Sequence, residues 1–159
     1  MGALLASARA GRGRLLAVRD GGRLAGVLVA APPGAYPFPP PPLRAQLRIV
    51  LGQGFSAAGR WRAVFDALDA VHPVVPHWYL ATLGVDVACQ GRGLGRALLA
   101  HWLREVDASG IPTYLETDLP RNTAFYEGAG FHLLRQIHVL ETPVWLLQRP
   151  APALGDVPA

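Results

Sequence analysis

Between residues 77 and 127 the chain alternates between short apolar runs and segments whose apolar side chains recur at helical spacing. This pattern predicts strands over residues 77–85 and 113–118, and helices over residues 94–106 and 120–127. Strands that alternate with helices are typical of a sheet whose faces are covered by helices. We therefore expect a mixed α/β fold.

Further elements are expected on both sides of this region. The turn sequence Asp20-Gly21-Gly22-Arg23 predicts a hairpin, and a second hairpin is expected around Glu141-Thr142-Pro143. The prolines between residues 32 and 42 exclude regular structure and predict an extended crossing of the surface. The expected strands are 15–19, 24–30, 131–140 and 144–148, and the expected helices are 43–51 and 61–71.

Composition limits the class of protein. With 159 residues, of which 51% are hydrophobic, the chain can bury one core, so we expect one domain over residues 1–150 and a frayed tail over 151–159. No run of about 18 apolar residues is present, which favours a soluble, cytoplasmic protein without a membrane partner. Cys89 is the only cysteine, so no internal disulfide can form, and no metal-ligand spacing is found.

The arginines gather most densely around a glycine-rich segment, Gln90-Gly91-Arg92-Gly93-Leu94-Gly95. Glycines between a strand and a helix let several backbone N–H groups converge on an anion, and the helix dipole adds positive charge there. Arg92 and Arg96 add full charges. The net charge of +4 is therefore explained better by a polyanionic small molecule than by a nucleic acid.

Two nucleotide-binding loops are excluded by the same segment. It has no Gly-Lys-Ser/Thr ending, and glycines at 91, 93 and 95 do not give the spacing of a dinucleotide-binding loop. Three glycines can also make only a tight turn from strand to helix, and the segment alone does not decide between these readings.

The neighbouring sequence resembles the acetyl-CoA core of the GNAT superfamily of acetyltransferases. The segments that carry this resemblance occur in the family's order, and the subgroup that includes puromycin N-acetyltransferase is the most similar. The resemblance implies an acyl-CoA N-acyltransferase fold whose central sheet splays between the strands at 77–85 and 113–118. The segments are Leu83-Gly84-Val85, Gln90 to Gly95, Asn122, Phe125-Tyr126-Glu127 and Gly130-Phe131, with His77-Trp78-Tyr79-Leu80, Leu115-Glu116-Thr117 and Pro120-Arg121-Asn122 indicating the subgroup.

The same resemblance assigns residues to acetyl-CoA. It implies that the loop amides hold the diphosphate, that the strand end pairs with the pantetheine amides, and that Asn122 bonds the pantetheine arm. It also implies N-terminal elements shorter than usual in the family, since the first hairpin begins close to residue 1. The cofactor-binding set is Leu83, Gly84, Val85, Gln90, Gly91, Arg92, Gly93, Leu94, Gly95, Arg96, Asn122 and Phe125, with no metal.

Tyr126 is the proposed general acid. It lies four residues after Asn122 on the same helix face, so its hydroxyl can reach the cofactor arm that Asn122 touches. The alternative is an aromatic ring that only packs in the core, a role that Phe125 suits better. The resemblance favours the catalytic role.

The general base is less clearly marked. Many GNAT enzymes carry an acidic base on the strand corresponding to 77–85, which here has no Asp or Glu. Glu116 shares a strand face with Tyr114 and Asp118, and is the candidate base, although it could instead bind the substrate ammonium or pair with an arginine. His77 could be a base, or a plain surface or capping group. The substrate-binding candidates are His77, Tyr79 and Asp118, and His72, His101, His132 and His138 are read as structural.

These residues predict an N-acetyltransferase that moves an acetyl group by direct attack to a primary amine of a small molecule or peptide. We expect a monomer or homodimer with no nucleic-acid partner. The alternative is an acetyl-CoA-binding sensor that lacks a working acid and base.

Overall fold

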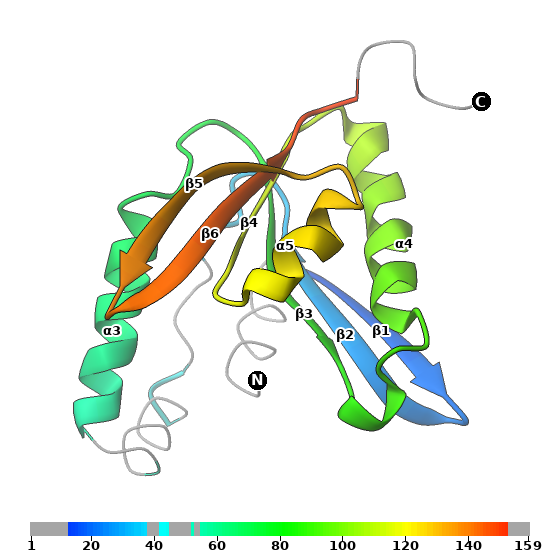
Figure 1. Ribbon diagram of the computed structural model, residues 1–159, viewed down its shortest axis with the longest axis horizontal. Coiled ribbons are helices and arrows are strands. Elements are labelled where there is room, and N and C mark those ends of the chain that lie inside the picture. Colours follow the sequence, from blue (N-terminus) through cyan, green and yellow to red (C-terminus); the bar gives the residue numbers. More distant parts are fainter. Residues whose placement is uncertain (1–12, 38–41, 45–51, 53–54, 153–159) are drawn as a thin grey trace.

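The computed structural model describes residues 13–37, 42–44, 52 and 55–152. Six strands form one mixed sheet in the order β1-β2-β3-β4-β6-β5, which confirms the expected α/β fold (Figure 1). The strands are β1 (Arg14–Asp20), β2 (Arg23–Ala31), β3 (Trp78–Val85), β4 (Thr113–Thr117), β5 (His132–Val139) and β6 (Thr142–Arg149), and the helices are α3 (Phe55–Asp69), α4 (Leu94–Ser109), α5 (Pro120–Glu127) and the short 3-10 turn η1 (Val87–Cys89).

β3 and β4 run parallel but separate almost at once. They pair at only two positions, the second being Tyr79 with Tyr114, whereas β2 follows β3 as far as Val85 and β4 pairs along its length with β6. Beyond this point the two halves of the sheet diverge (Figure 1). We call the opening the fork; its sides are β3 from Leu80 and β4 from Leu115. The expected splay is thus present.

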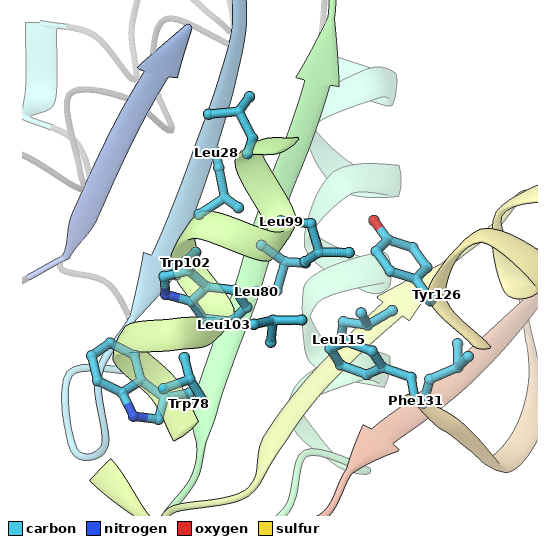
Figure 2. Close-up of a cluster of buried hydrophobic side chains, with 13 residues drawn as sticks. Leu28, Trp78, Leu80, Leu99, Trp102, Leu103, Leu115, Tyr126 and Phe131 are labelled. Atoms are coloured by element: carbon cyan, nitrogen blue, oxygen red, sulfur yellow. The ribbon is translucent and has the colours of Figure 1, made fainter. Parts of the chain in front are cut away.

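The two faces of the sheet pack against different helices. Leu115 belongs to the apolar cluster under α4 and α5, which includes Trp102 and Phe131 (Figure 2). Tyr114 belongs to a second cluster beside α3. Because side chains alternate along a strand, Glu116 faces the α3 side with Tyr114. Leu115 and Glu116 therefore lie on opposite faces of the sheet at the base of the fork.

The second hairpin turns earlier than expected. Leu140 and Glu141 have φ of 46° and 64°, so the turn has two residues, a length whose twist suits paired strands. Pro143 lies within β6 instead of in the turn, opposite His138. β4 pairs with β6 only from Trp145 onward, so a proline at 143 removes no hydrogen bond to β4.

Three other boundaries differ from the sequence prediction. α3 begins at Phe55 and ends at Asp69, earlier than the expected 61–71. β4 ends at Thr117, so Asp118 follows the strand. Residues 43, 44 and 52 are helical, but 45–51 of the helix expected there, and the tail from 153, lie outside the described residues.

Candidate active site

The glycine loop shapes the start of α4. Gly91 and Gly93 have φ of 74° and 78°, and Gly93 is the N-cap residue of the helix. A side chain rarely adopts this backbone conformation, so the loop needs glycine at both positions. The first intrahelical bond runs from Ala97 N–H to the Gly93 carbonyl. The N–H groups of residues 94–96 therefore have no acceptor within the helix and can bind an anion.

The loop is held to the end of β3. The Asp86 carboxylate accepts a hydrogen bond from Ala88 N–H at 2.9 Å, and Gln90 Nε2 donates to the Val85 carbonyl at 3.1 Å. Gly95 packs so closely that a Cβ there would lie 3.4 Å from Val85 and 3.9 Å from Phe125. Gln90, Gly95 and Phe125 thus fix the loop against β3 and α5.

The two loop arginines differ in their surroundings. Arg92 forms an ion pair with Asp20 at the end of β1, its Nη2 lying 3.2 Å from Oδ1. The hydrogen bond and charge of Arg92 lower the pKa of Asp20. Arg96 is exposed, and no ion pair joins it to another residue in the part of the chain that the structure describes. Arg96 is therefore the more available cation beside the loop.

The edge of β3 offers backbone groups to the fork. Asp86 N–H donates to the Ala25 carbonyl, and hydrogen-bonded pairs alternate along an antiparallel ladder. In this register Gly84 bonds β2, while Leu83 directs its N–H and C=O groups away from β2, as does Val85, whose carbonyl accepts from Gln90 Nε2. An extended amide chain in the fork could pair with these groups, so the strand fits a pantetheine arm.

Asn122 lies on the opposite side of the fork. Its Nδ2 donates to Thr117 Oγ1 at 3.1 Å, and Thr117 is buried at the end of β4. This bond holds the side-chain amide beside the strand end and uses only its nitrogen, so the Asn122 side-chain oxygen is not engaged by this bond. The diphosphate loop, the β3 edge and Asn122 together fit acetyl-CoA.

Tyr126 is buried more deeply than Phe125. Only 8% of Tyr126 is exposed, and its ring contacts those of Phe125 and Phe131 at centroid distances of 5.1 and 5.7 Å. Its hydroxyl points away from Leu115 and Phe131 (Figure 2). Burial raises the pKa of Tyr126 to about 12. The expectation that Phe125 packs in the core in place of Tyr126 was wrong, because the Tyr126 ring packs there too.

Glu116 lies at the base of the fork on the α3 face. It follows the last β3–β4 pair by two residues, and 7% of its side chain is exposed. Its Oε1 is 3.6 Å from His72 Nδ1. Burial first, and then the negative charge of Glu116, raise the pKa of Tyr79 and of Tyr114. The carboxylate is therefore surrounded by groups that stay protonated at neutral pH.

Two histidines lie next to Glu116 in a row, His72 and then His77. His77 Nε2 lies 2.9 Å from His72 Nε2, and His77 Nδ1 lies 2.7 Å from the Val75 carbonyl. Tyr36 stacks on the His72 ring with centroids 4.0 Å apart. Burial lowers the pKa of His77. A surface pocket of about 410 Å³ opens beside this cluster, and it is lined by Pro32, Pro33, Gly34, Tyr36, His72, Pro73, Val74, Val75, Pro76 and His77.

Comparison with known proteins decides the family. The sequence model of the acetyltransferase (GNAT) family matches residues 3–131. The chain belongs to the GNAT family. Members of this family take the acetyl group from acetyl-CoA.

Curated relatives of this GNAT protein match over part of their length. A mycothiol acetyltransferase of Beutenbergia cavernae is 37% identical over 83 residues, which are 50% of this chain and 25% of that protein. An uncharacterized N-acetyltransferase of Schizosaccharomyces pombe is 36% identical over 62 residues, or 39% of this chain and 25% of that protein. The aligned part thus spans a quarter of each relative.

Solved structures share the fold of this GNAT protein. A Corynebacterium glutamicum protein described as histone acetyltransferase HPA2 and related acetyltransferase has a TM-score of 0.63 at 26% identity, covering 90% of this chain and 67% of that one. The ribosomal-protein-S18-alanine N-acetyltransferase of Escherichia coli has a TM-score of 0.56 at 17% identity, covering 93% and 75%.

The GNAT fold brings most of the sequence-predicted residues to the fork. Glu116 and Tyr79 meet on its α3 side, whereas Asp118 is exposed and forms no hydrogen bond or ion pair with another described residue. His77 reaches Glu116 only through His72, a residue read as structural from sequence. Tyr36 was also missed. Both occur in proline-flanked loops that carry no family motif, so no sequence signal marks them.

No group of three or more His, Cys, Asp or Glu side chains is placed to hold a metal ion within residues 13–37, 42–44, 52 and 55–152. None of the described helices is long and apolar enough to cross a membrane.

Proposed function

We propose that this protein transfers an acetyl group from acetyl-CoA to a primary amine at the fork between β3 and β4. Three groups around the fork support the proposal. These are the N–H groups at the start of α4, the edge of β3 that does not pair with β4, and Asn122 beside the end of β4. Glu116 lies where the strands begin to separate.

Residues on the α4 side bind the donor. The N–H groups of residues 94–96 and the side chain of Arg96 hold the diphosphate, while Leu83 and Val85 pair with the pantetheine amides through their backbone. Asn122 hydrogen-bonds the same arm from α5. Gly91 and Gly93 contribute shape, since they let the loop backbone approach the phosphates.

The bound donor supplies an acetyl group activated as a thioester. Glu116 takes a proton from the acceptor ammonium, which leaves a nitrogen lone pair that forms a bond to the acetyl carbon while the carbon–sulfur bond breaks. Tyr126 gives its hydroxyl proton to the departing sulfur, which leaves as a thiol, and the second proton that the nitrogen loses on becoming an amide returns the Tyr126 oxygen to its protonated form. Burial keeps the Tyr126 hydroxyl protonated at neutral pH, so it has a proton to give.

The acceptor is a primary amine of a small molecule or a peptide. His77, Tyr79 and Asp118 are the candidates for binding it. The resemblance of residues 77–80, 115–117 and 120–122 to the puromycin N-acetyltransferase subgroup favours a small aminonucleoside-like molecule. The names of similar proteins leave both classes open, since one is a mycothiol acetyltransferase and another, similar in fold, is a ribosomal-protein-S18-alanine N-acetyltransferase.

Thiol release from acetyl-CoA tests the proposal. The protein is incubated with acetyl-CoA and a panel containing peptides with free N-termini, lysine, a polyamine and an amino-nucleoside, and free thiol is followed with a disulfide dye. We expect amine-dependent release with at least one member, and loss of release in Glu116→Gln. Binding of acetyl-CoA without turnover of any amine would instead support the sensor alternative.

A further inference from the structure

Three buried polar atoms around Glu116 have no hydrogen-bond partner among the described residues. They are Glu116 Oε1, His72 Nδ1 and the Tyr114 hydroxyl oxygen. Buried polar groups are almost always paired, so three such atoms in one place need an explanation. The positions of protons in the neighbouring histidines supply one.

The hydrogen bonds of His77 fix its tautomer. The Val75 carbonyl can only accept, so His77 Nδ1 must carry the proton in their 2.7 Å contact. A neutral His77 ring then has a bare Nε2. That nitrogen faces His72 Nε2 at 2.9 Å, so His72 Nε2 must be the donor.

This assignment leaves His72 Nδ1 facing the Glu116 carboxylate. If neither atom carries a proton, a nitrogen lone pair and a negative oxygen face one another at 3.6 Å in a buried site, which is unfavourable. A single proton between them removes the repulsion and turns the contact into an ion pair. Hydrogen bonds of this kind are often long before substrate binds.

The groups facing this pair come from every element packed around it. Among the described residues, these groups supply no cation that could replace the missing proton. Tyr36 is held by the Asp69 carboxylate at the end of α3, and the positive charge of Arg135 on β5 acts on Tyr114. The neighbours are His77 before β3, Tyr79 on β3, Tyr114 on β4 and Tyr36 after β2.

We propose that His72 and Glu116 hold one proton in common and act together as the base, with His77 as the residue that positions His72. The inference rests on the proposed acetyl transfer. A carboxylate paired with an imidazole lone pair takes up a proton more readily than a carboxylate alone. To act as the base, the pair first releases the shared proton to solvent; Glu116 then accepts a proton from the acceptor ammonium and shares it with His72 Nδ1, so the pair returns to its one-proton state.

NMR of the histidine rings tests the shared proton without any substrate. The protein is labelled with ¹⁵N-histidine, and the His72 and His77 signals are assigned with His72→Gln and His77→Gln. We expect a proton on His77 Nδ1 and on His72 Nε2, with His72 Nδ1 gaining a second proton as the pH falls. Glu116→Gln should move the midpoint of the His72 signals to lower pH, whereas the matched control Glu127→Gln at the end of α5 should not.

A His72 ring that carries its proton on Nδ1 and none on Nε2 throughout the titration overturns the proposal. A His72 midpoint that Glu116→Gln does not move does so too. These outcomes do not depend on turnover, so they are separate from a failure of the proposed acetyl transfer.

Kinetics give a second readout. With an amine that is turned over, kcat should rise with pH through a midpoint that stays constant among amines of different basicity. His72→Gln places an N–H donor against the carboxylate. The midpoint of the kcat profile should therefore move to lower pH, and the plateau value of kcat should fall roughly tenfold or more. A change in KM alone, with superimposed pH profiles of kcat, would reduce His72 to a structural neighbour of Glu116.

Discussion

Tyr126 combines a ring packed in the core with a hydroxyl whose raised pKa keeps it protonated. Removing only the oxygen separates these two contributions. We expect Tyr126→Phe to slow amine acetylation by roughly tenfold or more, because a positioned acid is lost, while acetyl-CoA affinity stays nearly unchanged.

The control for this variant lies on the same helix. Thr123 donates its hydroxyl to the Pro120 carbonyl, so Thr123→Val also removes one oxygen from α5 but none near the sulfur. Single-turnover rates and acetyl-CoA titrations of both variants give the comparison. Equal rates for Tyr126→Phe and the unaltered protein would remove Tyr126 from the chemistry.

His77 links the cluster near Glu116 to the stability of the fold. Burial lowers its pKa in the folded protein below the unfolded value, so the folded state binds this proton more weakly. Stability from His77 is therefore fully present above about pH 6.5 and is lost as the pH falls toward the folded pKa. Urea unfolding should show this loss between pH 7.5 and pH 5.5.

The variant His77→Gln should lose less stability than the unaltered protein over the same interval, since glutamine does not titrate. The difference between the two slopes is the measured quantity. Parallel slopes would show that His77 does not couple folding to pH.

At the scale of elements, α4 begins and ends on a glycine with positive φ. Gly93 at the start has φ of 78°, Gly110 at the end has φ of 63°, and a Cβ at either would contact no atom within 4 Å. Alanine therefore strains both positions by a comparable amount, but only Gly93 belongs to the loop.

We expect Gly93→Ala and Gly110→Ala to lower the melting temperature by similar amounts in the absence of ligand. Acetyl-CoA should raise the melting temperature of Gly110→Ala by as much as it raises that of the unaltered protein, and should raise that of Gly93→Ala much less. Equal ligand-induced shifts in both variants would contradict the assignment of the loop to the diphosphate.

How far the sequence predicts the structure also differs between elements. α5 and the strands around the fork could be predicted because their apolar spacing and glycines are local signals. The turn at Leu140-Glu141 could not, since neither residue type favours positive φ and the strand pairing on both sides imposes it. The meeting of His72 with Glu116 depends on how the loop before β3 folds back, which no local pattern encodes.

At the scale of the whole molecule, the fork gives two adjacent residues of β3 opposite tasks. Gly84 pairs with Val27 and holds the sheet together, whereas Leu83 directs its backbone toward the fork. Replacing one amide by an ester removes a single N–H and keeps the side chain. An ester at residue 83 should weaken acetyl-CoA binding several-fold with little loss of stability.

The same substitution at residue 84 should do the reverse, because that N–H belongs to the pairing between β2 and β3. A missing backbone hydrogen bond costs about 1 kcal/mol, which urea unfolding resolves. Calorimetric titration with acetyl-CoA completes the pair of measurements. If the ester at 84 weakens acetyl-CoA binding and the ester at 83 leaves it unchanged, the proposal that residue 83 faces the fork is contradicted.

The ion pair between Arg92 and Asp20 joins the glycine loop to the first hairpin. Asp20 gives this guanidinium an internal counter-ion, so a diphosphate entering the loop meets an arginine that is already engaged. On binding, the diphosphate would replace the Asp20 carboxylate beside Arg92, and the ion pair would form again when CoA leaves. We expect such an exchange to lower the affinity for acetyl-CoA and to speed product release, which would give Asp20 at the end of β1 an influence on turnover.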